Sequence, residues 1–267
     1  MIRLCPGPVS TSAMRFFFVK CYPAALAAIF LCLPPAQAAD VPLLSAVDSA
    51  APVIDAQAGF EALAALSGEA KAMAGERLMV LEVDLGNSPG FSVERIDGAV
   101  EVRYRMSFNN IAEGWNWYPQ ADPQKEDYYH AKFLPLKSVT VERGEYDQQD
   151  KIGETQRMKV SWRYDYFAAF ENLYDFYPRT VDDDSGFVVV LPASAAGQKQ
   201  PTVRMLAVLR LRDPLVAEST TFWKATHANP TDFTLKKRYL VGQLVEVWFL
   251  DAAGGGVLAK VKPRTAP

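Results

Sequence analysis

Apolar and polar side chains alternate along much of the C-terminal two thirds of the chain. In residues 100–108, Val100, Val102 and Tyr104 fall on one side of the alternation, and charged residues fill most of the other side. Residues 158–166 repeat this pattern with aromatic side chains. Because successive side chains of a strand point to opposite faces of a sheet, the alternation predicts strands that each bury one face.

Turn-forming residues separate these runs and define about eight or nine strands. The strands are expected at 77–85, 91–108 (a hairpin turning on Asp97-Gly98), 136–143, 158–166, 187–191, 203–211, 239–250 and 257–261. Most neighbouring runs have no helical crossover between them, so a parallel sheet is not expected. The sequence therefore predicts a mainly β fold, an antiparallel β-sandwich or a partly open barrel. Residues 214–232 are expected to form a loop.

One helical stretch precedes the strands, at residues 55–76, with Asp55 as a candidate N-cap and Gly68 as its weak point. Residues 39–54 are rich in Ala, Pro and Ser, and are expected to form a flexible lead-in. Residues 55–267 are then expected to form a single β-rich domain with one N-terminal helix.

Residues 1–38 have the three parts of a signal peptide. Arg15 and Lys20 precede an apolar stretch at 24–33, and Ala36-Gln37-Ala38 forms a small-x-small cleavage site. The apolar stretch has ten residues, whereas about 20 are needed to span a bilayer. We therefore expect cleavage after Ala38, no stable membrane insertion afterwards, and a periplasmic location, with an extracellular one as the alternative. Met1 and Met14 both remain possible starts.

All three cysteines lie in this leader, so the chain after Ala38 contains no thiol. Thiol catalysis, disulfides and thiolate metal sites are thereby excluded for the exported protein. The leader holds three of the 28 basic residues and none of the 31 acidic ones, which leaves the rest with a net charge of −6. A nucleic-acid partner is disfavoured by this charge.

The two histidines, His130 and His227, have no metal-binding spacing. We assign no metal, no cofactor and no catalytic residue. Gly86-Asn87-Ser88-Pro89-Gly90 matches the G-x-S-x-G pattern of serine hydrolases, in which a helix follows the serine. Here a hairpin is expected to follow, which favours an ordinary turn. A hydrolase that uses Ser88 or a pair of carboxylates remains an alternative.

The candidate binding site is an aromatic loop with polar neighbours. Its residues are Trp115, Asn116, Trp117, Tyr118, Tyr128, Tyr129 and His130. Flat apolar rings with polar groups at their edges are typical of sugar and peptide recognition. The alternative is that these rings fill the open end of the sandwich or barrel.

Two further groups of side chains recur on the strands. An aromatic cluster, half of which lies on a strict strand face, is expected to lie mostly in the core; its members are Trp162, Tyr164, Tyr166, Phe167, Phe170, Tyr174, Phe176 and Tyr177. Five arginines lie on the polar sides of strands: Arg103, Arg105, Arg163, Arg204 and Arg210. We expect them to pair with acids of neighbouring strands, and the alternative is a cationic stripe.

These features together predict an exported, periplasmic, non-catalytic binding or accessory protein of the cell envelope. Its partner would be an envelope glycan, a peptide or a protein that binds the aromatic loop. An immunity protein against a toxin delivered to the periplasm is an alternative of the same class. Two different classes also stay open, namely the hydrolase and a structural subunit of an envelope assembly.

Overall fold

The computed structural model describes residues 42–48, 50–88, 90–96, 99–105, 132–149, 152–170, 172–176, 186–191 and 203–264. The chain divides into two units, 1–37 and 38–267, and the described residues all belong to the second. The predicted signal peptide lies outside them.

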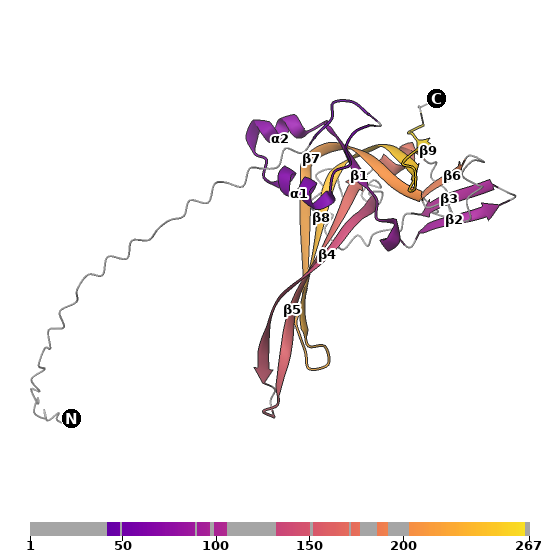
Figure 1. Cartoon of the computed structure of the whole chain (residues 1–267). Coiled ribbons are helices and arrows are strands. Elements are labelled where there is room, and N and C mark those ends of the chain that lie inside the picture. Colours follow the sequence, from indigo (N-terminus) through magenta and orange to yellow (C-terminus); the bar gives the residue numbers. More distant parts are fainter. Residues whose placement is uncertain are drawn as a thin grey trace, which may run out of the picture. The chain divides into compact units, whose positions relative to one another are not determined.

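Strands dominate the described residues (Figure 1). The helices are α1 (Ala56–Ala64) and α2 (Gly68–Ala74), with short 3-10 turns at Leu85–Asn87 and Asn172–Asp175. The strands are β1 (Leu78–Glu82), β2 (Phe91–Ile96), β3 (Ala99–Arg105), β4 (Lys132–Gln149), β5 (Thr155–Phe170), β6 (Gly186–Leu191), β7 (Val203–Trp223), β8 (Thr231–Asp251) and β9 (Val257–Val261).

The larger sheet has the strand order β1-β7-β8-β5-β4, and β9 also pairs with β8. The long hairpins β4–β5 and β7–β8 lie side by side in it, as Figure 1 shows. Their inner strands β5 and β8 run parallel, and every other pair is antiparallel. The connection between β5 and β7 includes β6, a strand of the other sheet.

The smaller sheet contains β2, β3 and β6, all antiparallel. Its buried residues Val100, Val102 and Tyr104 belong to the same hydrophobic cluster as Met79 and Phe249 of the larger sheet. Neither sheet is closed into a barrel, and the arrangement is consistent with a β-sandwich-like fold. The predicted fold class is therefore confirmed, in its open form.

The predicted N-terminal helix is present as two short helices. Asp55 caps α1, because its Oδ1 accepts hydrogen bonds from the backbone N–H groups of Gln57 (3.1 Å) and Ala58 (3.0 Å). The helix ends near Ala65, and Gly68 has a φ of +54°, a left-handed value that favours glycine. The weak point at Gly68 thus coincides with the break between α1 and α2.

The predicted loop at 214–232 is wrong, because most of it lies in β7 and β8. The register of these strands shifts between Leu211 and Val216, and this irregularity accommodates Pro214 without ending the strand. Beyond the shift, residues 219–223 are mostly exposed, so they lack the buried alternation from which the other strands were predicted.

Residues of the predicted lead-in lie along the outer edge of β1. Leu44 and Leu78 exchange two backbone hydrogen bonds of 2.9 Å, and the Ile54 N–H donates to the Val80 carbonyl at 2.8 Å. Ile54 belongs to the main hydrophobic cluster. This contact brings the start of α1 onto one face of the larger sheet.

Candidate ligand-binding face

Helix α1 covers only one part of its sheet face. The Phe60 ring packs edge-on against Tyr166 with centroids 6.1 Å apart, and the Arg238 guanidinium lies 5.0 Å from the Phe60 centroid. Tyr166 is 2% exposed beneath the helix. Trp162 and Tyr164 precede Tyr166 on the same face of β5, and both are half-buried. Of the aromatic cluster predicted to lie mostly in the core, Tyr166, Phe170 and Phe176 are buried, and Trp162, Tyr164 and Phe167 are half-buried.

Strand register explains which side chains meet here. Tyr164 stands opposite Lys236 of β8, and Tyr166 stands opposite Arg238. On the other side, Arg143 follows Val141 of β4 at an irregularity between Glu142 and Gly144. We call Arg143, Trp162, Tyr164, Tyr166, Lys236 and Arg238 the aromatic–cationic face.

Each cation of this face lies over a ring. The Arg143 guanidinium is 4.7 Å and the Lys236 ammonium 5.3 Å from the Trp162 centroid, and Arg238 is 4.6 Å from that of Tyr164. Arg143 also donates a 2.9 Å hydrogen bond to the Tyr164 hydroxyl. Cation–π contacts of this kind contribute about 0.5–2 kcal/mol each and hold the cations in place.

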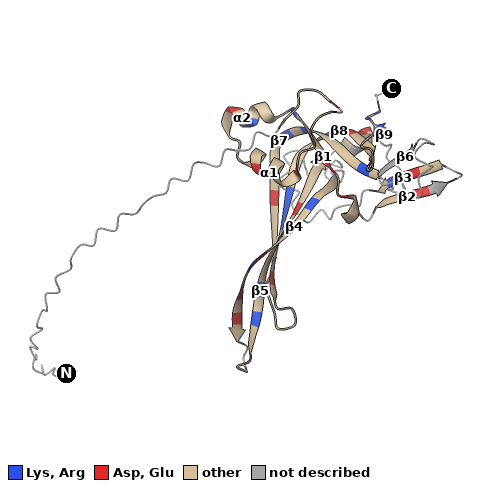
Figure 2. Ribbon diagram, in the orientation of Figure 1, with Lys and Arg blue, Asp and Glu red and all other residues tan. Residues whose placement is uncertain are grey.

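Glu218 of β7 partly neutralises the face. Its two carboxylate oxygens accept hydrogen bonds from Lys236 (3.0 Å) and Arg238 (2.7 Å). Burial raises the pKa of Glu218, but these hydrogen bonds outweigh it and leave that pKa below its usual value. Among the described residues, Arg143 forms no ion pair with a carboxylate. Elsewhere on the strands, acidic and basic residues are interspersed along the ribbon (Figure 2).

A pocket of about 250 Å³ lies between α1 and this face. It is lined by Gln57, Glu61, Val139, Val141, Arg143, Tyr164, Tyr166 and Arg238. Glu61 accepts a 3.0 Å hydrogen bond from Gln57. Together with Glu218, the face and pocket contain three cations and two carboxylates, which leaves an excess of one positive charge.

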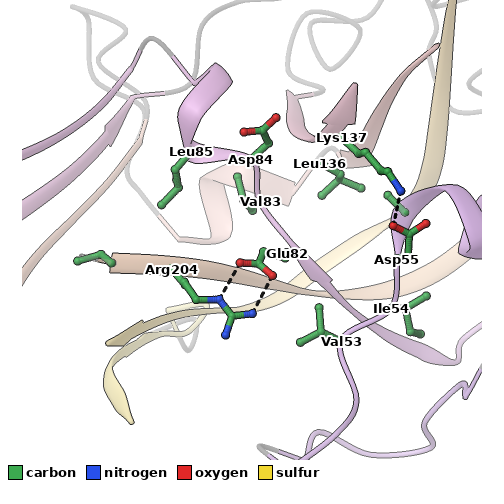
Figure 3. A pocket seen from close by; sticks show the side chains of 12 residues that line it. Val53, Ile54, Asp55, Glu82, Val83, Asp84, Leu85, Leu136, Lys137 and Arg204 are labelled. Carbon is green, nitrogen blue, oxygen red and sulfur yellow. Dashed lines mark hydrogen bonds and ion pairs between the residues drawn. The ribbon is translucent and has the colours of Figure 1, made fainter. Parts of the chain in front are cut away.

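A second pocket, of about 600 Å³, lies by the start of α1 (Figure 3). Its lining is Val53, Ile54, Asp55, Ala56, Glu82, Val83, Asp84, Leu85, Leu136, Lys137, Val203 and Arg204. Two ion pairs lie in its wall. Lys137 Nζ is 2.6 Å from Asp55 Oδ2, and Arg204 donates two 2.7 Å hydrogen bonds to Glu82. We call it the ion-paired pocket.

Three of the five strand arginines form ion pairs with acidic side chains of the described residues. Arg103 pairs with Glu101, Arg163 with Asp165 and Arg204 with Glu82. Arg103 lies in the smaller sheet and the other two in the larger one. Arg204 pairs across strands, from β7 to β1, as predicted, whereas Arg103 and Arg163 pair with acids two residues away on their own strands, β3 and β5. Cross-strand pairing is therefore confirmed for Arg204, and the three arginines do not form one stripe.

Ser88 closes a turn between β1 and β2. Its side chain is buried, its hydroxyl donates a 2.6 Å hydrogen bond to the Asp84 carbonyl, and the Tyr104 hydroxyl lies 3.2 Å away. Burial raises the pKa of Tyr104, and the Ser88 hydrogen bond opposes this increase. Strand β2 follows, as the turn interpretation predicted, instead of a helix.

His227, the histidine in the chain order that a hydrolase requires, lies in the β7–β8 turn. Its carbonyl accepts a hydrogen bond from the side-chain amide of Gln156, near the start of β5. The turn that contains Ser88 is bonded to β4, because the Asp84 N–H donates to the Pro135 carbonyl. Pro135 pairs with Phe167 of β5, which in turn pairs with Tyr239 of β8. At about 3.3 Å per residue, the eight residues from Tyr239 back to Thr231 span roughly 25 Å, so the two side chains are not neighbours.

The predicted aromatic loop from Trp115 to His130 lies outside the described residues, so it remains a prediction. Within the described ranges, no three His, Cys, Asp or Glu side chains are grouped as metal ligands would be. The helices in the same ranges include none that is long and apolar enough to cross a bilayer.

Comparison of the chain with protein-family models, with curated proteins and with solved structures gave no match. Function is therefore inferred from the side chains themselves. Sequence reasoning missed Arg143, Lys236 and Arg238. A signal for the latter two was present, because Phe233 and Leu235 alternate with Thr234 and Lys236, which is typical of a strand.

Proposed function

We propose that this protein is an exported, periplasmic, non-catalytic binding protein that holds an acidic glycan of the cell envelope on the aromatic–cationic face. The observation that carries the proposal is the combination of half-exposed rings with cations that exceed the carboxylates. The guanidinium of Arg143, without a carboxylate partner among the described residues, is the group best placed to receive an anion.

The contacts of this face suit an acidic sugar. Guanidinium groups bind carboxylates through two parallel hydrogen bonds, and aromatic surfaces accept the apolar faces of sugar rings. Stacking on Trp162 and the bond to Tyr164 hold Arg143 before the ligand arrives. Such preorganisation lowers the entropic cost of binding. The aromatic loop from Trp115 to His130 is proposed as a further contact for the same ligand.

Calorimetric titration with trigalacturonic acid and with the neutral maltotriose tests the proposal. We expect only the acidic trisaccharide to bind, and its affinity to fall as salt is added. Arg143→Gln should weaken binding about tenfold or more, since a hydrogen bond between charged groups contributes about 1.5–3 kcal/mol.

Arg157→Gln is the matched control. Arg157 also lies in the β4–β5 hairpin, but it pairs with Asp147 (3.3 Å) and Glu145 (3.6 Å) near the turn. Its replacement should leave the affinity unchanged. Equal binding of the two trisaccharides, or equal affinities of the wild type and Arg143→Gln, would contradict the proposal.

A protein partner is the second candidate, in the form of an immunity function. Exposed apolar side chains favour it: Phe222 and Trp223 at the end of β7 are 57% and 47% exposed, and Ile152 by the β4–β5 turn is 81% exposed. Aromatic side chains of this kind are enriched in protein interfaces. An immunity function requires a toxin gene beside this one, which the genome sequence can decide.

A further inference from the structure

We propose that the ion-paired pocket is a second ligand site, and that it takes a zwitterion of the amino-acid or short-peptide type. This proposal does not depend on the aromatic–cationic face. The pocket is formed by other residues, from the segment before α1, the end of β1, and the strands β4 and β7. Its volume of about 600 Å³ is within the usual range for small-molecule sites, about 300–1,000 Å³.

Charges of both signs face this pocket from separate elements. Figure 3 shows the Asp55–Lys137 pair and the Glu82–Arg204 pair at different sides of it, with Val83 and Leu136 between them. A ligand of a single charge would approach a like charge at each pair. A ligand with both an ammonium and a carboxylate can complement both pairs, so the arrangement selects a zwitterion.

The cations still have hydrogen-bonding capacity. An ammonium has three donors and a guanidinium has five. Lys137 gives one hydrogen bond to Asp55, and Arg204 gives two to Glu82. A ligand carboxylate can therefore bind either cation without breaking its ion pair, and a ligand ammonium can bind the outer lone pairs of the carboxylates.

Because the two ion pairs are partly exposed to solvent, their rearrangement costs little free energy. The side chains of Lys137 and Asp55 are 36% and 50% exposed, and those of Arg204 and Glu82 are 38% and 44% exposed. Ion pairs with such exposure contribute little to folding, because water screens them. Lys137 and the Glu82–Arg204 pair can therefore shift toward a ligand at little cost to the stability of the fold, while Asp55 stays in place because it caps α1.

Both carboxylates are ionised at neutral pH. The hydrogen bond from Arg204 lowers the pKa of Glu82 below its usual value. Burial raises the pKa of Asp55, but hydrogen bonds from Lys137 and the start of α1 outweigh it and leave that pKa lowered. Asp84 is a third carboxylate in the lining. The pocket therefore presents two cations together with three acidic side chains, so a ligand needs an ammonium as well as a carboxylate to complement it.

The pocket also has an apolar floor. Ile54, Val83 and Leu136 are buried side chains in its lining, and Val203 and Leu85 extend the apolar surface. An aliphatic side chain of the ligand can lie on this surface while its charged groups reach the ion pairs. A dipeptide of leucine combines these features.

The test compares Leu-Leu with Leu-Leu amide and N-acetyl-Leu-Leu, by calorimetry and by amide chemical shifts of the ¹⁵N-labelled protein. The amide lacks the carboxylate and the acetylated form lacks the ammonium, while the aliphatic groups are the same. We expect Leu-Leu to shift the amides of residues 53–56 and 82–85, and each blocked form to bind at least tenfold more weakly. This comparison uses the wild-type protein alone.

Glu82→Gln should weaken Leu-Leu binding at least fivefold, because the ammonium loses a charged acceptor. Glu142→Gln is its control, since Glu142 is an exposed carboxylate of β4 that does not line the pocket. Equal binding of the three compounds, or an absence of shifts at millimolar Leu-Leu, overturns the proposal. Failure of trigalacturonic acid to bind would overturn only the glycan proposal.

Discussion

At Gly242 of β8, the backbone and side chains of β7 leave no room for a Cβ atom. A Cβ atom placed on Gly242 would lie 2.3 Å from the Arg210 carbonyl oxygen and 2.7 Å from Leu209 Cγ. Gly242 pairs with Leu211, directly beside the register shift of β7. Gly242→Ala therefore forces the two central strands of the larger sheet apart.

The size of the effect follows from what must move. Overpacking in a core costs about 1–3 kcal/mol, and here the obstacle is a backbone carbonyl that cannot rotate away as a side chain would. We expect a loss of about 3 kcal/mol in the free energy of unfolding. In a domain of this size each kcal/mol lowers the Tm by about 2–4 °C, so the Tm should fall by roughly 6–12 °C.

Thermal unfolding followed by circular dichroism, with urea titration alongside, measures this loss. Gly256→Ala is the matched control, because its Cβ would have no atom within 4 Å and Gly256 lies in the turn before β9. We expect the control to change the Tm by less than about 2 °C, as is usual for exposed sites. If the two variants have the same Tm, the close approach of β7 and β8 at Gly242 is refuted.

Two further predictions concern single side chains. Glu218→Gln should destabilise the protein by about 1–2 kcal/mol at pH 7 in urea titrations, since it loses charged hydrogen bonds to Lys236 and Arg238. The pKa of Glu218 is lowered in the fold from its ordinary value of 4.5, so the stability lost by the variant should be constant at pH values above 4.5. The difference should vanish as the pH falls further and Glu218 is protonated. A loss that stays constant down to pH 3 contradicts the pairing. Ser88→Ala should cost about 1–2 kcal/mol through its hydrogen bonds to Asp84 and Tyr104. A fluorophosphonate should label neither wild type nor variant, and labelling of the wild type alone would restore the hydrolase.

The sequence predicted those parts of the fold in which alternation coincides with burial. In 158–166, Met158 and Tyr166 are buried and Lys159 and Arg163 are exposed, as the two-residue period requires, whereas Ser161 departs from it because it is buried on the polar side. The hairpin on Asp97-Gly98 was also predicted, and its strands pair from Phe91–Tyr104 to Ile96–Ala99. Local pattern is sufficient where one face of a strand meets the core.

The outer halves of β7 and β8 could not be predicted in this way. Residues 219–223 are mostly exposed, so no core imposes alternation on them, and they are strands because they pair with residues 233–237. The aromatic–cationic face depends on the same non-local pairing. Arg143 and Lys236 both lie over Trp162, although they are far apart in the sequence. Only the tertiary register brings them together.

The parallel pairing of β5 with β8 also determines the order in which the fold can assemble. Lys159 pairs with Thr231 and Phe170 with Gly242, so each contact closes a loop of about 70 residues. As the chain is synthesised from its N-terminus, the β4–β5 hairpin can form alone, but its inner edge has no partner until β8 is complete. Strand β1 likewise has no partner strand until β7 has been synthesised, because β1 pairs with β7. Assembly of the larger sheet is therefore a late, non-local step, and we expect slow folding with an exposed strand edge that a holding chaperone could cover.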